Sequence, residues 1–508
     1  MIFEGEATPP PWAEQGLRKG YTRAWEAVTI LPVHVRSRGW FPLLVALIAA
    51  GSDEQSRGTT ARAGIGSQAE PALPSDAADP ALQFWPQWRG PLATGFAPQA
   101  DPPLTWSETE NVRWKTALPG LGHSSPIVWG ARVFVTTALA YGEEVEPVPD
   151  RDPGAHDNAP LTQARAFFVL ALRRDTGTIE WRTEVRAELP HEGAHESASF
   201  ASASPVTDGE RVFAFFGSRG LYCLDVEGGV LWSADFGEMR VKHGHGEGAS
   251  PALHGQTLLV NWDHEEESFL LALDKETGEE RWRIARDEAT SWATPIVIEH
   301  AGRAQAVVSG TKRVRGYDLE TGAVLWECGG LSSNIVASPV YGDGMVFAGS
   351  SYERQALLAI RLEGASGDIT DGAQLVWVRR RGTPYVPSPL LYGDALYFLQ
   401  HYQALLSRVL TRDGSEPARA TRIEGLHDIY ASPVGAAGRI YVTDLDGMTA
   451  VLSHAPEPKT LALNQLDDSF AASADLIFLM IPSRCARILT LISSAIFLVS
   501  LDSSSRRS

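Results

Sequence analysis

Short runs of β-branched and aromatic residues, separated by polar turns that contain glycine, recur along the middle of the chain. Between about residues 120 and 470, each unit opens with a small residue and a proline and passes through a glycine turn into an apolar strand. The opening prolines are Pro126, Pro205, Pro251, Pro295, Pro339, Pro389 and Pro433. From Pro205 onward their spacing is 44 to 50 residues, and the longer first interval holds a polar, proline-rich insertion at about residues 141–163. A four-stranded repeat of this length predicts a β-propeller; the alternative, a pair of two-sheet sandwiches, fits the regular prolines poorly.

The second half of the unit ends in a tight turn followed by a tryptophan. The copies are ALRRDTGTIEW (171–181), CLDVEGGVLW (223–232), ALDKETGEERW (272–282) and GYDLETGAVLW (316–326). The aspartate can accept hydrogen bonds from the backbone amides of the turn, and the glycine supplies a positive φ. The tryptophan then lies on an outer strand, where its ring can fill the wedge between neighbouring sheets. We expect this docking role for Trp114, Trp181, Trp232, Trp282 and Trp326.

These copies resemble the PQQ-like repeat family, also called the quinoprotein alcohol dehydrogenase-like propellers. The family pattern Ala-x-Asp-x-x-Thr-Gly-x-x-x-Trp is matched by Ala272, Asp274, Thr277, Gly278 and Trp282. The segment WPQWRGP (85–91) is similar to the beginning of exported bacterial members. The resemblance covers residues 84–474 and implies an all-β, eight-bladed propeller of four-stranded blades. It is specific for the fold and weak for function, because one fold serves many functions.

The closing blade of this ring is in doubt. Seven units are complete, and an eighth begins at SFAAS (469–473), where Ala474 replaces the expected proline. Residues 112–118 match only the last strand of a unit, so we expect them to be the outer strand of a blade whose inner strands follow Ser469. Closure of this kind removes free sheet edges. The residues after Asp475 lack alternating strands, and either a frame error or divergence would explain this.

The two ends of the chain differ from the repeats. Residues 1–51 form an extension that ends in RSRGWFPLLVALIAA (36–50), which has the layout of a secretory signal; an uncleaved anchor is the alternative. Residues 52–83 are rich in Ala, Ser, Gly, Asp and Pro and predict a disordered linker. Residues 475–508 are a divergent apolar tail of uncertain structure. We expect an exported, periplasmic or extracytoplasmic protein that meets a membrane only through its N-terminal apolar segment or this tail.

Charge and cysteine content narrow the possible partners. The net charge of −18 repels phosphate backbones and argues against nucleic acid. Cys223, Cys328 and Cys485 lie in no metal-type spacing, so we expect buried thiols, with a disulfide between Cys223 and Cys328 left open. We expect a monomer.

Dehydrogenase chemistry is weakly supported. The family resemblance implies a calcium ion held by acidic and amide oxygens, a catalytic aspartate, and often an adjacent cysteine pair that stacks on the quinone. The sequence contains no Cys-Cys pair and no CxxCH haem motif. It also contains no recognisable carboxylate pair, GxSxG or phosphate-binding loop. We therefore assign no catalytic residue and expect no cofactor, with PQQ and calcium as the alternative.

Polar loops on one face of the propeller are the remaining candidates for a site. They include HEGAHES (191–197), KHGHGEG (242–248), DHEEES (263–268), SYER (351–354), HYQ (401–403) and HDIY (427–430). His245 and His427 each precede a repeat proline by six residues, which predicts equivalent positions near the channel mouth. Imidazoles and carboxylates together suit a divalent metal. The candidate ligands are His191, His195, His243, His245, His264 and His427. The alternative is a set of solvated, hydrogen-bonded loops.

These observations favour a non-catalytic extracytoplasmic propeller that acts as a binding or assembly scaffold. The expected partner is a protein, peptide or small ligand on the loop face, and a family parallel is the propeller lipoprotein of the outer-membrane β-barrel assembly machine. No cysteine follows the apolar run near the N-terminus, so lipid attachment is not supported. The rival is a PQQ-dependent dehydrogenase or a metal-assisted enzyme that uses the histidine-rich rim.

Overall fold

The repeats of the sequence fold into a series of antiparallel sheets. The structure, a computed structural model, describes residues 80–472 and 497–500, all within the unit Gln68–Ser508. The predictions for residues 1–51, for the linker up to residue 79 and for most of the tail lie outside the described residues. Three short 3-10 helices accompany the strands, η1 (Pro80–Gln83), η2 (Gly217–Arg219) and η3 (Lys242–Gly244), and the described ranges contain no α-helix.

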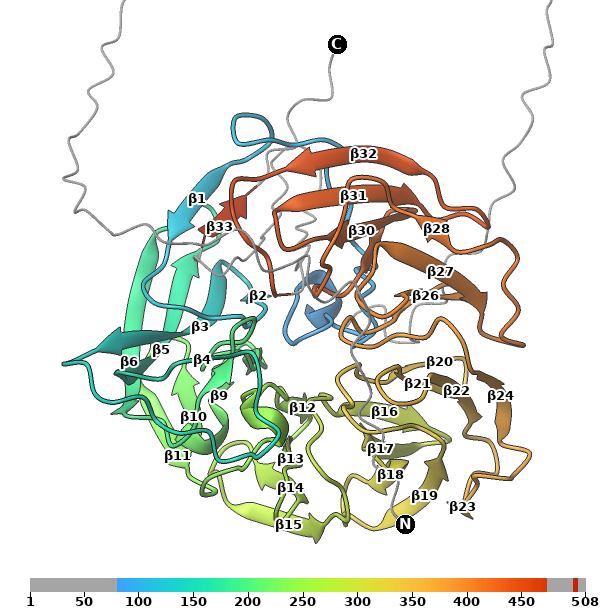
Figure 1. The fold of residues 1–508 in the computed structure, drawn as a ribbon, viewed down its shortest axis with the longest axis horizontal. Helices are drawn as coiled ribbons and strands as arrows, with labels where there is room; N and C mark the ends of the chain where they lie inside the picture. The colour runs from blue at the N-terminus through green and yellow to red at the C-terminus, as the bar shows by residue number, and fades with distance from the viewer. Residues whose placement is uncertain (1–79, 473–496, 501–508) are drawn as a thin grey trace, which may run out of the picture. The chain divides into compact units, whose positions relative to one another are not determined.

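Seven units of the repeat form complete four-stranded blades, and Figure 1 shows them around a common centre with the first strand of each blade innermost. Blade 1 contains β2 (Ile127–Trp129), β3 (Arg132–Tyr141), β5 (Ala164–Arg173) and β6 (Ile179–Glu188). Blade 2 contains β8 (Val206–Thr207), β9 (Arg211–Phe215), β10 (Leu221–Asp225) and β11 (Val230–Ala234). Blade 3 contains β12 (Ala252–His254), β13 (Thr257–Trp262), β14 (Phe269–Asp274) and β15 (Glu280–Ala285).

The later blades repeat this order. Blade 4 contains β16 (Ile296–His300), β17 (Arg303–Ser309), β18 (Arg313–Asp318) and β19 (Val324–Gly329), with β23 (Gly367–Asp368) added in parallel to β19. Blade 5 contains β20 (Val340–Gly342), β21 (Met345–Ser350), β22 (Ala356–Arg361) and β24 (Leu375–Arg379). Blade 6 contains β25 (Leu390–Tyr392), β26 (Ala395–Leu399), β27 (Leu405–Leu410) and β28 (Thr421–Arg422). Blade 7 contains β29 (Val434–Ala436), β30 (Arg439–Thr443), β31 (Met448–Ser453) and β32 (Thr460–Gln465).

The eighth sheet joins the two ends of the repeat region. Strand β1 (Trp114–Ala117) pairs antiparallel with β33 (Phe497–Ser500), so that Trp114 faces Ser500 and Ala117 faces Phe497. The expected outer strand therefore pairs with a segment that follows Ser469. The protein is an all-β, eight-bladed propeller with seven complete blades and a closing blade of which two strands are described.

A belt of hydroxyl groups explains why a small residue precedes each proline. In six successive pairs, the backbone N–H of one such residue donates to the hydroxyl of the next, at 2.9 to 3.0 Å. The members are Ser125, Ser204, Ser250, Thr294, Ser338, Ser388 and Ser432, all of them buried. The proline that follows holds each of them in an extended conformation. This hydroxyl belt ties the first strands of neighbouring blades together around the centre.

Tryptophans tie the outer strands together. Trp114, Trp181, Trp232 and Trp282 each donate the indole N–H, at 3.0 Å, to a carbonyl in the turn of the next blade. The turn glycines lie under these rings: a Cβ added at Gly278 would meet Trp232 at 2.7 Å. Trp114 and Trp282 are buried, whereas Trp181 and Trp232 are half-buried.

Two tryptophans depart from the expected set. The N–H of Trp326 bonds to Gln305 of its own blade at 3.0 Å, because a loop containing β23 lies along β19 where the tight turn of blade 5 would be. Trp377, which the motif did not reveal, donates to the carbonyl of Thr411 at 2.8 Å.

Candidate functional site

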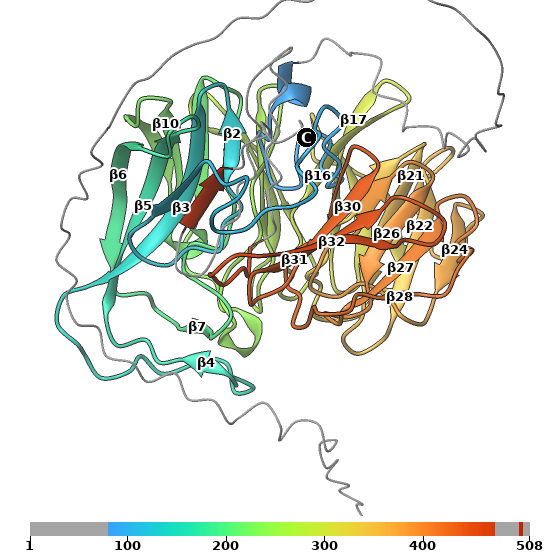
Figure 2. The same cartoon turned by 90° about the horizontal axis from the view of Figure 1, so that it is seen from above.

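A cavity of about 430 Å³ lies at the centre of the blades. Its floor is formed by most of the hydroxyl belt and by Trp88 of the segment that enters the propeller. Figure 2 shows η1 of this segment at one end of the sheets and the strands β4 (Asn158–Ala159) and β7 (Ala194–His195) at the other. The loops that begin the blades and loops that join their second and third strands surround the cavity. They place side chains from distant parts of the sequence around one space.

An aromatic ladder forms one side of this cavity. It consists of Tyr352, Tyr385, His401, Tyr402 and Tyr430, which come from the loops of blades 5, 6 and 7. Tyr385 stacks on His401 with 4.6 Å between ring centroids, and Tyr402 stacks on Tyr430 at 5.9 Å. Tyr352 stacks on Tyr385 at 5.8 Å and keeps 46% of its surface exposed. A continuous set of flat apolar faces with hydroxyl tips is therefore open to a ligand.

Burial opposes a charge on three members of this ladder. It raises the pKa of Tyr385 to about 12 and also raises the pKa of Tyr430, while it lowers the pKa of His401. At neutral pH Tyr385 and Tyr430 are therefore neutral hydrogen-bond donors and acceptors rather than bases. His401 adopts φ +62°, an uncommon left-handed conformation for a residue other than glycine.

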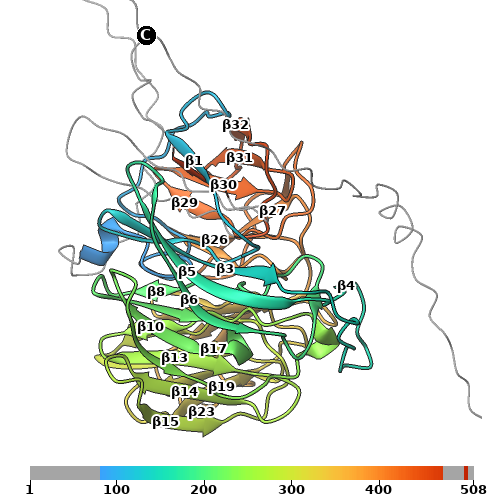
Figure 3. The same ribbon diagram turned by 90° about the vertical axis from the view of Figure 1, so that its left-hand side faces the viewer.

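Four histidines form a second cluster, and three of them, His156, His195 and His245, line the cavity. His156, His195, His243 and His245 have ring centroids 4.7 to 5.1 Å apart in four pairs. His195, His243 and His245 precede blades 2 and 3, and His156 belongs to the insertion between β3 and β5. Figure 3 shows that strand β4 of this insertion lies at the margin of the sheets, where it pairs with β7. Burial, and after it the three neighbouring imidazoles, lower the pKa of His245 to about 4.

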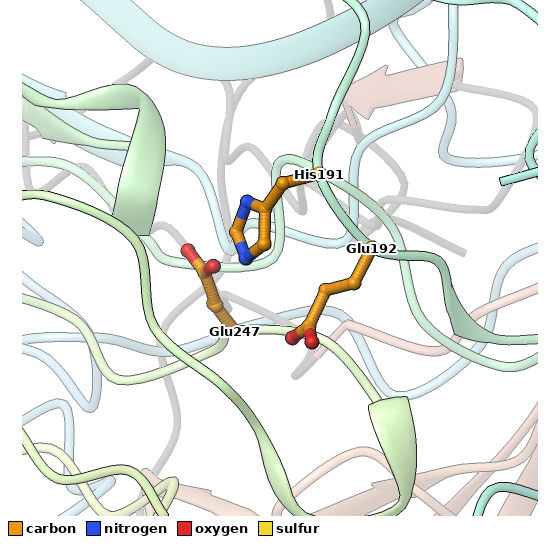
Figure 4. Close-up of side chains that lie close together, drawn as sticks. All are labelled: His191, Glu192 and Glu247. Atoms are coloured by element: carbon orange, nitrogen blue, oxygen red, sulfur yellow. The ribbon is translucent and has the colours of Figure 1, made fainter. Parts of the chain in front are cut away.

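His191 lies in a separate, acidic group with Glu192 and Glu247, as Figure 4 shows. One possible ligand atom from each lies within 4.8 Å of the others. Glu247 accepts hydrogen bonds from Ser218 and from Nη1 of Arg219, the latter at 3.0 Å. Oε1 of Glu192 accepts from the N–H of Val241 at 3.1 Å. Burial, and after it the nearby carboxylate of Glu247, raise the pKa of Glu192 to about 7.

The acidic group and its surroundings offer the oxygen ligands that a hard cation binds. Glu192 and Asn261 line a second cavity, of about 30 Å³. Within the described residues, Oε2 of Glu192 and Oδ1 of Asn261 are buried and have no hydrogen-bond partner. Buried oxygens of carboxylate and amide groups are the ligands that Ca²⁺ prefers. These residues therefore fit the calcium ion that the quinoprotein resemblance implies.

The remaining parts of a quinone site are not formed by the described residues. Cys223 and Cys328 are buried free thiols in β10 and β19, so neither lines the central cavity and they are not bonded to each other. Asp263, the carboxylate beside Asn261, is engaged by Arg286 at 2.7 Å and is fully buried. It is therefore an ion-pair partner and not a free base.

The other predicted histidines lie away from the central cavity. His264 is buried and its ring bonds to the backbone of Arg240 and Glu267 at 3.2 and 3.1 Å. His427 is exposed and pairs with Asp446 at 2.9 Å, so it does not occupy the position of His245. Sequence reasoning missed His156 and Tyr385. The only signals were the polar character of the insertion and the position of Tyr385 three residues before the belt residue Ser388.

The repeated four-stranded blades, the belt and the tryptophan docking define a propeller of PQQ-like repeats. A family profile described as "Outer membrane protein assembly factor BamB" (PQQ_2) matches residues 165–366 and 266–482, more than half of the chain. The chain belongs to this family.

Solved structures with a similar fold include BamB and two dehydrogenases. BamB from Moraxella catarrhalis has 13% identity, a TM-score of 0.49, and coverage of 72% of this chain and 98% of its own. A europium-containing methanol dehydrogenase has 10% identity, a TM-score of 0.44, and coverage of 81% and 90%. The quinohemoprotein alcohol dehydrogenase ADHIIG from Pseudomonas putida HK5 has 10% identity, a TM-score of 0.49, and coverage of 83% and 77%. A sequence search of curated proteins finds no significant match.

Among residues 80–472 and 497–500, no helix has the length and apolar character needed to cross a bilayer.

Proposed function

We propose that this protein is a non-catalytic, exported scaffold that binds an extended polypeptide segment of a partner protein at the channel mouth. The observation that carries the proposal is the aromatic ladder beside the 430 Å³ cavity. Family membership and the signal-like segment at residues 36–50 support an extracytoplasmic location.

The chemistry of the ladder suits a peptide. Tyrosine presents a large, rigid, apolar face together with a hydroxyl, and it orders with little loss of conformational entropy. The flat faces of Tyr352 and Tyr402 can pack against apolar or proline side chains. The hydroxyl tips and the belt can bond to backbone amides and carbonyls of an extended segment. The net charge of −18 disfavours polyanionic ligands.

A quinone-dependent enzyme is the second candidate, and the unpaired oxygens of Glu192 and Asn261 favour it. These residues would hold a calcium ion, which polarises a bound oxygen atom. The ion pair between Asp263 and Arg286 argues against this candidate, because it occupies a carboxylate that lines the same cavity as Glu192 and Asn261.

Photo-cross-linking in the producing cell tests the proposal. A photoreactive residue at Tyr352, in the ladder, should cross-link to a discrete polypeptide, whereas the same residue at Leu463, exposed on outer strand β32, should not. Equal cross-linking at both positions would contradict a specific site at the mouth. Alcohol oxidation by the purified protein that depends on added quinone and calcium would favour the enzyme instead.

A further inference from the structure

We propose that His156, His243 and His245 form a binding site for a divalent transition-metal ion such as Zn²⁺ at the channel mouth. Their ring centroids lie 4.8, 4.8 and 5.1 Å apart. With metal–nitrogen bonds of about 2.0 Å, imidazoles on a tetrahedral ion have centroids roughly 5 Å apart. The ring centroids therefore have the spacing of imidazoles on one ion, while the ligand nitrogens themselves still have to turn toward a common point. This site is separate from the proposed peptide-binding function and does not depend on it.

Backbone carbonyls determine which nitrogen of each ring is free to bind a metal. The carbonyl of Gly154 accepts from Nδ1 of both His156 and His243, at 2.8 and 2.9 Å. Nε2 of His245 donates to the carbonyl of His156 at 3.3 Å. A carbonyl can only accept, so these nitrogens carry the protons and the opposite nitrogens carry the lone pairs. Such bonds to the second nitrogen are the usual support of metal-binding histidines.

The ring nitrogen of His243 that carries the lone pair is available to a metal ion. Its Nε2 is buried and, within the described residues, has no hydrogen-bond partner. His243 also adopts φ +60°, a strained left-handed conformation for a residue other than glycine. Asn158 of strand β4 holds its carbonyl at 2.9 Å. The fold therefore holds an unsatisfied imidazole nitrogen in place at this position.

Two of the three proposed ligands, His156 and His245, line the central cavity. Nδ1 of His195 accepts the N–H of Ser197 at 3.1 Å, so its other nitrogen carries the proton and is not a ligand in this state. Three imidazoles and an open position are a common zinc arrangement. Binding requires the rings, which now contact one another edge to face, to turn their lone pairs toward one point. Side-chain rearrangements of this kind often accompany binding.

A bound ion would link the insertion of blade 1 to the segment that precedes blade 3. His156 comes from the insertion, whereas His243 and His245 come from the segment before blade 3. The nitrogen donors also separate this site from the oxygen donors of Glu192 and Asn261, because imidazole selects transition metals and carboxylate or amide oxygen selects calcium.

Metal titration of the full chain tests the site. Protein stripped with a chelator is titrated with Zn²⁺ in competition with a chromophoric chelator, and Co²⁺ provides a visible spectrum as a second readout. We expect one tight equivalent per chain, with affinity reduced on the order of 10- to 100-fold in His156→Ala and in His245→Ala. His427→Ala, an exposed histidine outside the cluster, and Glu192→Gln, in the acidic group, should leave Zn²⁺ affinity unchanged.

Several results would overturn the proposal. These are the absence of a stoichiometric Zn²⁺ equivalent, affinity that His156→Ala does not reduce, or an equal loss in His427→Ala or Glu192→Gln. His156 is exposed in the insertion, so its variant should fold even if His245→Ala does not, and metal-free melting curves verify this.

Discussion

The indole N–H of Trp282 in blade 3 donates to the carbonyl oxygen of Leu319 in blade 4 at 3.0 Å. The ring also covers Gly322, where an added Cβ would lie 2.7 Å from Cε3 of the tryptophan. Gly322 has φ +73°, which other residues rarely adopt. A tryptophan on one blade and a glycine turn on the next therefore form one interlocking contact, and its repetition ties neighbouring blades together at their outer edges.

Removal of this contact should destabilise the propeller. Trp282→Ala empties a buried aromatic site and should lower the free energy of unfolding by roughly 3–5 kcal/mol. Trp282→Phe keeps an aromatic ring but loses the hydrogen bond, and should cost roughly 1–2 kcal/mol. Denaturant unfolding measures both. The exposed control Leu463→Ala should stay within about 0.5 kcal/mol of the wild type, and an equal loss in that control would refute the docking role.

Loss of one hydroxyl from the belt should also destabilise the propeller. Ser204→Ala removes the acceptor of the buried Ser125 N–H, which is 2.9 Å away. An unsatisfied buried amide should cost about 1–3 kcal/mol and speed hydrogen exchange of that amide. Thr294→Ser keeps a hydroxyl in the belt and should have little effect. Unchanged stability and exchange in Ser204→Ala would show that the belt does not bind the blades together.

The sequence was sufficient to predict the repeat and the ring. Local rules determine both features: a small residue before proline forms the belt, and an aspartate–glycine turn receives a tryptophan. The predicted docking is wrong where the next blade lacks the partner turn. Trp326 keeps the motif but has no tight turn to dock on, because blade 5 replaces that turn with a longer loop.

The site was harder to predict, because it depends on contacts between distant segments. Tyr352 and Tyr385 lie on separate loops, and only the closure of the ring stacks them at 5.8 Å. His156 joins the other histidines because β4 pairs with β7, a pairing of two residues on each strand that no sequence pattern indicates. Periodicity describes each blade, whereas the cavity depends on how the blades meet.

Glu192 predicts a pH dependence of stability. Its pKa in the folded state is raised to about 7, so the native protein retains a proton that the unfolded chain releases above its ordinary pKa of 4.5. The free energy of unfolding should therefore fall as the pH rises from about 4.5 to 7. Glu192→Gln should remove this slope and gain on the order of 3 kcal/mol above pH 7.

Urea unfolding at several pH values measures this effect. Glu457→Gln, at an exposed site, is the matched control and should follow the wild type throughout. Added calcium should also raise the stability of the wild type above pH 7 if the oxygens of Glu192 and Asn261 hold that ion, and not that of Glu192→Gln. A difference between Glu192→Gln and wild type that is the same at all pH values would show that the carboxyl group is not perturbed by burial.

If the protein is exported, its mature chain should lack the N-terminal segment. If residues 36–50 act as a secretory signal, protein isolated from the producing cell should begin near Ser52. Intact-mass measurement of the purified protein determines this directly. Cytoplasmic protein that begins at Met1 would contradict an extracytoplasmic scaffold.

The most direct test of the proposed scaffold is the affinity of the channel mouth for the polypeptide segment that cross-links to position 352. Fluorescence anisotropy measures the Kd of that synthetic peptide for the wild type and for Tyr352→Ala plus Tyr402→Ala, with Tyr141→Ala, an exposed tyrosine outside the ladder, as control. We predict a loss of about 2 kcal/mol or more in the double variant, roughly 30-fold in Kd, with an unchanged melting temperature and an unchanged control. Equal affinity in the double variant and the wild type would contradict a recognition role for the aromatic ladder.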